Sequence, residues 1–428
     1  MFAANTSLGI VTTAAGKQVY DLTHSELALG LLGLAEFAPA FVLVFVSGVV
    51  ADRYQRRRVA ATGYVGGAVV LAALATYVAL GSGGTVQIFV AMILAGTARA
   101  FTEPAVRSLP ADTVAPEALP RLSPRVSFIW QSGMILGPVA GGFLYVAGVW
   151  LTYATAAALL GVAAIAVLFV RARTGQGRAA TRRAATRRAA TGAAPDESGV
   201  RRGIREAREG ARFVRSQPVL LGAISLDLFA VLFGGAVALL PAIAEDRLGV
   251  GAVGLGWLRA AIGIGAASMT LILMVRPVTR RVGRVLLLAV AVFGLGTVVL
   301  GVTTSFAVAF VALAVASAAD AISVFIRTTL VPLITPSAMR GRVLALESVF
   351  IGASNQLGAF ESGVAGQILG PAAAVGLGGV ATLVVAAVWW VRFPKLRDLD
   401  RFPDAEADER GGGRGDAGDA GDASAEAP

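Results

Sequence analysis

The sequence predicts an all-α membrane protein in which twelve transmembrane helices form two pseudo-symmetric bundles of six. The first observation is composition: of 428 residues, 56% are hydrophobic and 15% are charged, with a mean hydropathy of +0.72. Soluble globular domains carry about 25% charged residues, so this chain has too little polar surface to face water on all sides. The second observation is that six apolar stretches lie on each side of a long basic segment. Each is near the length of about 20 residues that a spanning helix needs.

The expected spans follow one another with short, turn-like breaks such as GSGGT at 81–85. In the N-terminal half they are 2–20, 27–51, 59–80, 85–108, 125–147 and 150–170. In the C-terminal half they are 219–244, 252–275, 285–303, 305–330, 343–368 and 370–392.

The first span is unusually polar. Its polar residues are Asn5, Thr6, Ser7, Thr12, Thr13, Lys17 and Gln18. Either this helix lines a water-filled cavity, or the chain starts after its natural beginning. Lys17 is expected near the outer end with its ammonium group reaching toward water, and a contact with substrate is the alternative.

These spans divide the chain into four parts. Residues 1–170 form the N-terminal six-helix bundle, 171–217 a basic cytoplasmic linker, 218–392 the C-terminal six-helix bundle, and 393–428 a disordered cytoplasmic tail. Within the linker, apolar residues recur at spacings of four and three, at Val200, Ile204, Ala207, Ala211 and Val214. With arginines between them, this pattern predicts an amphipathic helix on the anionic inner leaflet of the membrane.

Basic residues occur on alternate connections between the spans. The connections after the second and eighth spans each carry four arginines: Arg53, Arg56, Arg57 and Arg58, then Arg276, Arg280, Arg281 and Arg284. The connections after the third, fifth, ninth and eleventh spans carry none. Because positively charged connections stay on the cytoplasmic side, both termini are expected in the cytoplasm and the protein in the inner (cell) membrane.

The charge and the rare residue types exclude several functions. The net charge of +10 does not indicate a nucleic-acid partner, because thirteen arginines lie in the single stretch 171–215. The chain has no cysteine and one histidine, His24, which excludes disulfides, thiolate metal sites and Cys/His catalysis. We therefore expect no enzyme activity, no metal and no cofactor. The expected partners are a small-molecule substrate, protons and the lipid bilayer, with the protein acting as a monomer.

A short charged run interrupts the apolar sequence after the second span. It contains Gly48, Asp52, Arg53, Arg56 and Arg57. Taken alone, it is a tight turn whose arginines anchor the topology. A second charged turn, at 276–284, follows the eighth span in the same way. Matched turns in two six-helix halves indicate a duplicated fold with its binding site between the halves.

A second motif lies on the fifth span and combines small residues with a proline. Its residues are Gly133, Gly137, Pro138, Gly141 and Gly142. Glycines four residues apart let two helices approach closely, and a proline removes a backbone donor and can bend the helix. Taken alone, the motif indicates close helix packing of the kind found in any membrane bundle.

Both motifs resemble signatures of the major facilitator superfamily. The run at 48–57 resembles its Gly-x-x-x-Asp-Arg-x-Gly-Arg-Arg signature, with Gln55 in place of the second glycine. The run at 133–142 resembles the Gly-x-x-x-Gly-Pro-x-x-Gly-Gly pattern of proton-antiporting exporters in that superfamily. The wider sequence is similar to the enterobactin-exporter-like, drug-efflux branch in the stretches VYDLT (19–23), ADRYQRRRV (51–59), LRAAIGIGA (258–266), MRGRV (339–343) and NQLGAFESG (355–363).

The resemblance implies roles for both motifs. It implies that Asp52 and Arg53 are gating residues, with Asp52 accepting from the N-terminal end of the eleventh helix, near 341–343, to close the cytoplasmic side. Arg280 stands in the second charged turn where an acid would be needed, so this lock is expected in one half only. The resemblance also implies that 133–142 is a hinge that favours export and limits leak.

Charged residues inside the apolar spans are the remaining site candidates, because a charge in hydrocarbon is costly unless it is paired or hydrated. They are Glu36, Arg99, Glu103, Asp227, Arg259, Asp320, Arg327 and Glu361, and Asn355 is a further polar candidate. Arg99 and Glu103 lie four residues apart and are expected to pair along one helix face. Arg259 and Glu361 are expected to form an inter-helix pair with a structural role.

The sequence therefore predicts proton-coupled efflux of a small amphipathic compound, either drug-like or a siderophore, by alternating access. In this hypothesis a proton enters a carboxylate near the membrane midplane from outside, with Asp320 favoured over Asp227. Because fold does not decide direction, an importer or facilitator on the same fold is one alternative. A membrane sensor without transport activity is another.

Overall fold

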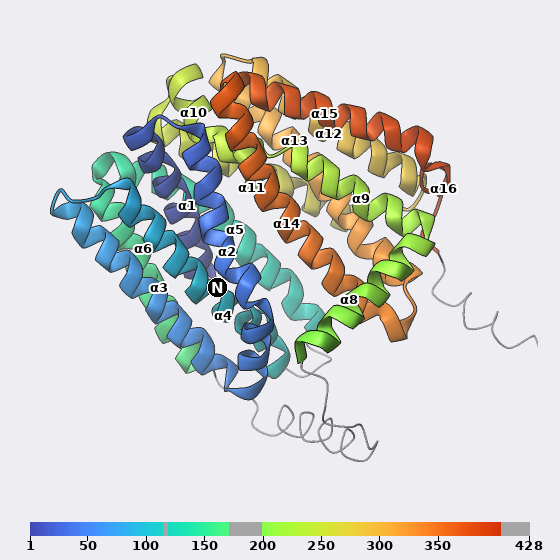
Figure 1. Ribbon diagram of the computed structural model, residues 1–428, viewed down its shortest axis with the longest axis horizontal. Helices are drawn as coiled ribbons and strands as arrows, with labels where there is room; N and C mark the ends of the chain where they lie inside the picture. The colour runs from blue at the N-terminus through green and yellow to red at the C-terminus, as the bar shows by residue number, and fades with distance from the viewer. Residues whose placement is uncertain (114–118, 171–198, 404–428) are drawn as a thin grey trace, which may run out of the picture.

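The computed structural model describes residues 1–113, 119–170 and 199–403, and every regular element within these ranges is a helix (Figure 1). The N-terminal half contains α1 (Phe2–Thr23), α2 (Glu26–Arg53), α3 (Arg56–Ala79), α4 (Thr85–Thr113), α5 (Leu119–Ala147) and α6 (Val149–Phe169). The C-terminal half contains α9 (Pro218–Phe233), η2 (Ala236–Leu239), α10 (Leu240–Ala242), η3 (Ile243–Arg247), α11 (Gly251–Val275), α12 (Val282–Val302), α13 (Phe306–Ile334), α14 (Ser337–Leu369) and α15 (Pro371–Arg392). Helix α8 (Gly199–Ser216) precedes this half and α16 (Pro394–Arg397) follows it.

Eleven helical segments of the described chain are long and apolar enough to cross a membrane. Helix α1 is the polar member of the N-terminal bundle, and neighbouring helices satisfy part of its polar surface. The Ser7 hydroxyl donates to the carbonyl of Ala156 at 2.8 Å, and the Tyr153 hydroxyl donates to Gln18 Oε1 at 2.7 Å. Burial among helices, rather than exposure to lipid, therefore makes this polar sequence compatible with a spanning helix.

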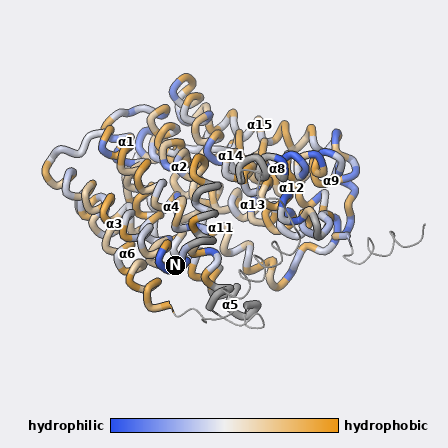
Figure 2. The backbone as a smooth tube through the Cα atoms, turned by 60° about the horizontal axis from the view of Figure 1, so that its bottom comes forward, coloured by the Kyte–Doolittle hydropathy of each residue, from blue (hydrophilic) through white to orange (hydrophobic). Residues whose placement is uncertain are grey.

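Large apolar side chains cover the outside of the bundle. Phe143, Ile165 and Leu271 are each more than half exposed, on α5, α6 and α11. Figure 2 shows apolar residues along the helix bodies and hydrophilic residues gathered along α8. An apolar surface of this extent on a multi-pass helical protein faces lipid.

The bundle has two distinct ends. The connections at 24–25, 80–84, 303–305 and 370 lie at one end, here called the far end. The connections at 54–55 and 276–281 lie at the other, here called the linker end, together with α8 and α16. Local signals fix some helix ends: Ser25 caps α2 by accepting from the amide of Ala28, and Gly370 takes a φ of +82° before Pro371 begins α15.

The two halves approach each other closely toward the far end. A Cβ atom placed on Gly30 of α2 would lie 3.1 Å from the Cα of Gly363 on α14. On the other side of the bundle, a Cβ on Gly142 of α5 would lie 2.5 Å from the carbonyl oxygen of Ala252 on α11. Helices α2 and α14 lie together at the far end and separate toward the linker end (Figure 1).

The span expected at 219–244 is broken, which the sequence analysis did not predict. Helix α9 ends at Phe233, and η2 begins after Gly234 and Gly235. Pro241 has no amide hydrogen for the carbonyl of Val237, which instead accepts from Leu240, so the α-helical ladder cannot run through this point. Close packing also requires the glycine pair, because a Cβ on Gly235 would lie 2.6 Å from the carbonyl oxygen of Gly358.

The amphipathic helix expected in the linker corresponds to α8, which packs onto the C-terminal half. Val214 is buried with residues of α9, α13 and α14, and Arg342 Nη1 of α14 lies 2.6 Å from Glu209 Oε2. Residues 171–198, and the side chains of Val200, Ile204 and Ala207, lie outside the described part of the chain.

Residues 393–403, expected to belong to a disordered tail, are ordered against the C-terminal half. Residues 393–403 contain α16, whose Leu396 is fully buried against the C-terminal bundle. Two hydrogen bonds from Arg397 lower the pKa of Asp398, which also lies 3.7 Å from Arg284. Apolar residues at every third position of this charged segment therefore anchor it: Phe393, Leu396, Leu399 and Phe402. Residues 404–428 lie outside the described chain.

Candidate transport cavity and charge clusters

A cavity of about 410 Å³ lies between the two halves. The N-terminal half contributes Thr12, Gly16, Leu32, Glu36 and Met92 to its wall, and the C-terminal half contributes Val237, Arg259, Asp320, Asn355 and Gln356. The volume falls in the range of about 300–1,000 Å³ that is typical of small-molecule sites. A mostly apolar wall with a few polar groups suits an amphipathic ligand.

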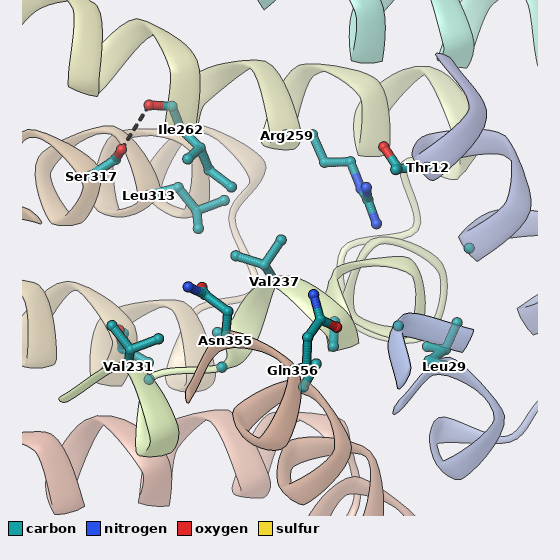
Figure 3. A pocket seen from close by; sticks show the side chains of 18 of the residues that line it. Thr12, Leu29, Val231, Val237, Arg259, Ile262, Leu313, Ser317, Asn355 and Gln356 are labelled. Carbon is teal, nitrogen blue, oxygen red and sulfur yellow. Dashed lines mark hydrogen bonds between the residues drawn. The ribbon is translucent and has the colours of Figure 1, made fainter. Parts of the chain in front are cut away.

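Polar side chains enter the cavity from opposite walls. Arg259 extends into it from α11 toward Thr12 of α1, while Asn355 and Gln356 reach in from α14 (Figure 3). Val237, in the broken segment between α9 and α10, lies at the centre of this view. A cavity therefore lies where the sequence predicts a binding site between the halves, and a discontinuous helix lines it, an arrangement that is typical of transporter binding sites.

Asp320 lies in the wall of this cavity, on α13. Within the described residues, its carboxylate forms no hydrogen bond or ion pair, although Asp227 and Arg327 act on it electrostatically. Its location is compatible with the predicted role in proton coupling, and the role itself stays a prediction.

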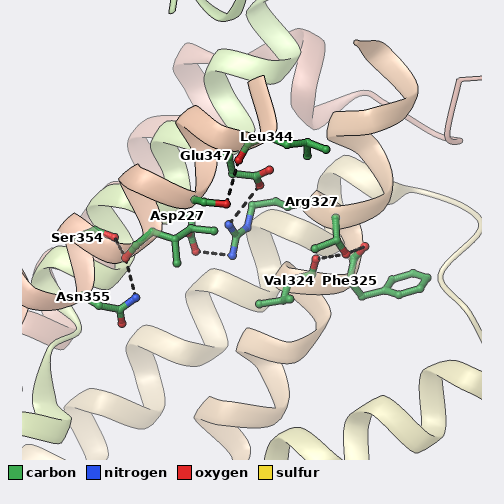
Figure 4. Close-up of polar contacts among 11 residues, drawn as sticks. Asp227, Val324, Phe325, Arg327, Leu344, Glu347, Ser354 and Asn355 are labelled. Carbon is green, nitrogen blue, oxygen red and sulfur yellow. Dashed lines mark hydrogen bonds and ion pairs between the residues drawn. The ribbon is translucent and has the colours of Figure 1, made fainter. Parts of the chain in front are cut away.

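A buried ion-pair cluster lies within the C-terminal half (Figure 4). Arg327 of α13 lies between two carboxylates, with Nη2 2.7 Å from Asp227 Oδ1 of α9 and Nη1 3.9 Å from Glu347 Oε1 of α14. The side chains of all three are less than a tenth exposed. Asn355 lies close to this cluster and also lines the cavity.

Glu347 was not predicted as a site residue, although it lies inside the expected span 343–368. A carboxylate within an apolar span was the available signal, the same one that singled out Asp227 and Asp320. With Glu347 included, one guanidinium acts electrostatically on three carboxylates in this part of the bundle, and pairs directly with two of them.

The predicted pair of Arg99 and Glu103 is part of a longer chain of charges. Arg99 Nε lies 3.6 Å from Glu103 Oε2, and Arg99 Nη1 donates to Glu36 Oε1 of α2 at 2.9 Å. Arg107 Nη2 lies 2.5 Å from the other oxygen of Glu103. These contacts join α4 to α2 next to the cavity, where Glu36 forms part of the wall.

The predicted pair of Arg259 and Glu361 is wrong. Arg259 points into the cavity, whereas Glu361 is exposed on α14, and no ion pair joins them among the described residues. The two residues lie at similar depths on their helices, but their side chains point in different directions. Arg259 Nε is buried without a hydrogen-bond partner.

The glycine motif of α5 packs on two helices at once. Gly133, Gly137 and Gly141 face α1, where a Cβ on Gly137 would lie 2.7 Å from the carbonyl oxygen of Thr6. Gly142 faces α11 of the other half, and the carbonyl oxygen of Pro138 lies 2.5 Å from where a Cβ of Gly256 would stand. The expected close helix approach is present, and its role as a hinge stays a prediction.

Lys17 lies in an ionic contact that joins the halves at the far end. It is buried rather than extended into water, and its ammonium pairs with Asp21 of α1 and, at 3.0 Å, with Glu245 Oε2 of the C-terminal half. The Tyr20 hydroxyl donates to Asp246 next to it. Glu245 and Asp246 of η3 were not predicted as site residues, because the expected span ended at residue 244.

The predicted gating motif lies at the linker end, where α2 ends and α3 begins. The surroundings of Gly48 and the side chains of Asp52 and Arg53 lie outside the part of the chain that the structure describes. Arg56 and Arg57 begin α3 and are half-buried. Helix α14 begins at Ser337, about one turn before the position expected for the contact with Asp52, and the gating role stays a prediction.

Comparison with known proteins identifies the family. Residues 1–301, more than half of the chain, match the profile of the Major Facilitator Superfamily. The chain belongs to this superfamily. It is therefore a multi-pass membrane transporter, as the resemblance of its motifs predicts.

Related sequences and solved structures agree with this assignment. The chain is 24% identical over 411 residues to the enterobactin exporter EntS of Escherichia coli (strain K12), which covers 94% of this chain and 92% of that protein. Its fold is similar to a D-xylose-proton symporter, with a TM-score of 0.68, 15% identity and coverage of 95% and 97%. It is also similar to the nucleoside transporter NupG, with a TM-score of 0.62, 14% identity and coverage of 92% and 96%. At these identities the structural likeness shows the fold alone, and it confirms the predicted arrangement of two helical bundles.

Proposed function

We propose that this protein exports a small amphipathic compound from the cytoplasm in exchange for protons, by alternating access of its two halves. The linker end is the cytoplasmic end in this proposal, because arginines gather on the connections there. The structure is then the state that faces the cytoplasm, since the close approaches between the halves lie toward the far end.

The charge cluster beside the cavity is the observation that supports proton coupling. Asp227, Asp320 and Glu347 outnumber Arg327, the guanidinium that acts on all three. Such an excess of carboxylates in a membrane interior can hold a proton. Because the cluster links α9, α13 and α14, a change in its charge acts directly on helices that form the cavity wall.

Two observations support efflux as the direction of transport. The 133–142 run resembles the pattern of proton-antiporting exporters, and the relative that matches over most of the chain is named an exporter. The cavity wall supports an amphipathic substrate, since Leu32, Met92 and Val237 provide apolar surface beside Arg259 and Asn355.

Proton movement in energised everted vesicles tests this proposal. A pH-sensitive dye reports the internal proton concentration while a panel of drugs and siderophores is added. One compound class should release protons through the wild-type protein. The Asp320→Asn variant should lose this response because its cavity wall cannot take up the proton. Asp52→Asn should reduce it because the proposed cytoplasmic lock is weakened.

The exposed Asp400, which lies outside the cavity, provides the matched control. Asp400→Asn should retain the full response, and membrane levels of all variants should be equal. A full response in Asp320→Asn would contradict its role as the coupling carboxylate. Substrate accumulation inside cells, in place of depletion, would establish import.

A further inference from the structure

The guanidinium of Arg259 lies in the transport cavity without a protein partner. It extends from α11 across the cavity toward α1, and its terminal nitrogen Nη2 lies 3.4 Å from where a Cβ of Gly16 would stand (Figure 3). Its Nε is buried with no hydrogen bond. In the part of the chain that the structure describes, Arg259 forms no ion pair either.

The nearby carboxylates do not neutralise this charge by direct contact. Glu36, in the same cavity, accepts from Arg99 at 2.9 Å. Asp320 lies on α13 beside the cluster of Arg327, and Glu361 is exposed on α14. Glu36 is therefore engaged with Arg99, and neither Asp320, which shares the cavity wall, nor Glu361 forms an ion pair with Arg259 among the described residues.

A partly buried guanidinium without a direct partner is costly, because it loses hydration and receives no hydrogen bond or ion pair in return. Glu36 acts on Arg259 only at a distance, through its charge. A ligand that brings an anionic group into the cavity would supply both contacts. Arginine suits this task because its planar fork of donors matches the two oxygens of a carboxylate. A cationic ligand group at the same place would be repelled.

We infer that Arg259 is the anion-binding subsite of the transport cavity, and that the transported compound carries an acidic group. The apolar side chains of Leu32 and Met92 then contact the body of the compound, while Asn355 and Gln356 offer hydrogen bonds from the opposite wall. This inference rests on the proposed transport function and adds the class of substrate. The cavity then has separate places for the two charges. The acidic group of the compound binds at Arg259, and the proton is held by Asp320 and the carboxylates near Arg327.

Equilibrium binding of two matched fluorescent probes tests the inference. Dansylglycine carries a carboxylate, and dansylglycinamide has the same fluorophore and a neutral amide. Each is titrated into the full chain in lipid nanodiscs, without a proton gradient. The wild-type protein should bind dansylglycine at least about tenfold more tightly, as expected for hydrogen bonds to a charged group.

Three variants assign the preference to Arg259. Arg259→Gln should bind the two probes with equal affinity, whereas Arg259→Lys should keep part of the preference because it keeps the charge. Arg276→Gln removes an exposed arginine from the end of the same helix and should behave as wild type.

Several results would overturn the inference. Equal affinities in the wild type, no saturable binding of either probe, or a preference that survives in Arg259→Gln would each do so. The wild-type comparison decides the question even if Arg259→Gln does not fold. Carboxylate-selective binding together with absent proton exchange in vesicles would refute the proposed coupling and leave the anion subsite in place.

Discussion

Arg327 shows how a single residue can hold three helices together inside an apolar bundle. It is buried on α13 and joins Asp227 of α9 to Glu347 of α14. Removing one member of a buried pair leaves an uncompensated charge, which costs more than the intact pair contributes. The three residues therefore stabilise the bundle only as a set.

We expect Arg327→Gln to lower the free energy of unfolding by about 3 kcal/mol, because it leaves Asp227 and Glu347 buried without a positive partner. Adding Asp227→Asn to this variant should recover part of the loss. Chemical unfolding in detergent micelles measures both values. Arg284 and Asp398 form a half-exposed pair at 3.7 Å, and Arg284→Gln should change stability by less than about 0.5 kcal/mol. Equal losses in Arg327→Gln and Arg284→Gln would show that burial does not set the cost.

The sequence identified the site carboxylates better than it identified their partners. Asp227 and Asp320 could be found because a charge in an apolar span is conspicuous, and Asp320 does line the cavity. The pairing of Arg259 could not be predicted. The sequence shows how far along its helix a residue lies, but not toward which neighbouring helix its side chain points. That direction turns through a full circle every 3.6 residues.

At the scale of helices, α5 connects the packing within one half to the packing between the halves. Three of its glycines contact α1, and Gly142 contacts α11 of the other half. A change at Gly142 therefore affects how the halves meet without altering the interior of the N-terminal bundle.

We expect Gly142→Ala to weaken the closure between the halves at the far end. The added methyl group would stand 2.5 Å from the carbonyl oxygen of Ala252, so α5 and α11 must separate. A cysteine placed at Thr12, inside the cavity, should then react faster with an impermeant maleimide applied at the far end. Gly161→Ala on α6 is the control, since a Cβ there meets no atom within 4 Å. The proposed packing is refuted if both variants leave the reaction rate unchanged.

The expected spans agree with the helices to within a few residues at most ends. They were predictable because the hydropathy of a stretch directly reflects how well it fits the lipid interior. The break between α9 and η2 was not predicted. Gly234, Gly235 and Pro241 lie in a continuously apolar stretch, so hydropathy does not change where the backbone does. The contact with Gly358, which requires a glycine at 235, comes from a distant part of the chain.

For the molecule as a whole, the far end is closed by polar contacts as well as by helix packing. Lys17 pairs with Glu245 across the halves, the Tyr20 hydroxyl donates to Asp246, and the Ser25 hydroxyl donates to Gln367 at 2.7 Å. The two halves could be predicted from the sequence, because a long basic linker separates two sets of six apolar stretches. The sequence could not predict which end is closed, because one sequence must support both states of an alternating-access transporter.

Loss of the ion pair between the halves should shift the protein toward a state open at the far end. In Glu245→Gln, Lys17 keeps Asp21 as a partner, so the variant weakens the contact without leaving a buried charge unpaired. If the pair is worth about 1 kcal/mol, the open population and the labelling rate of a cysteine at Thr12 should rise about fivefold. Because the chain has no native cysteine, an impermeant maleimide added to intact cells reports this position alone.

Three controls make the labelling result decisive for the whole molecule. Glu361→Gln removes an exposed carboxylate that makes no contact between the halves and should leave the rate at Thr12 unchanged. A cysteine at the exposed Ser82, at the far end, should react in intact cells, whereas one at the exposed Ser216 of α8 should react only in everted vesicles. The reverse pattern at Ser82 and Ser216 would invert the proposed orientation. An unchanged rate at Thr12 in Glu245→Gln would mean that helix packing alone closes the far end, since the polar contact would then contribute nothing to the balance between the two states.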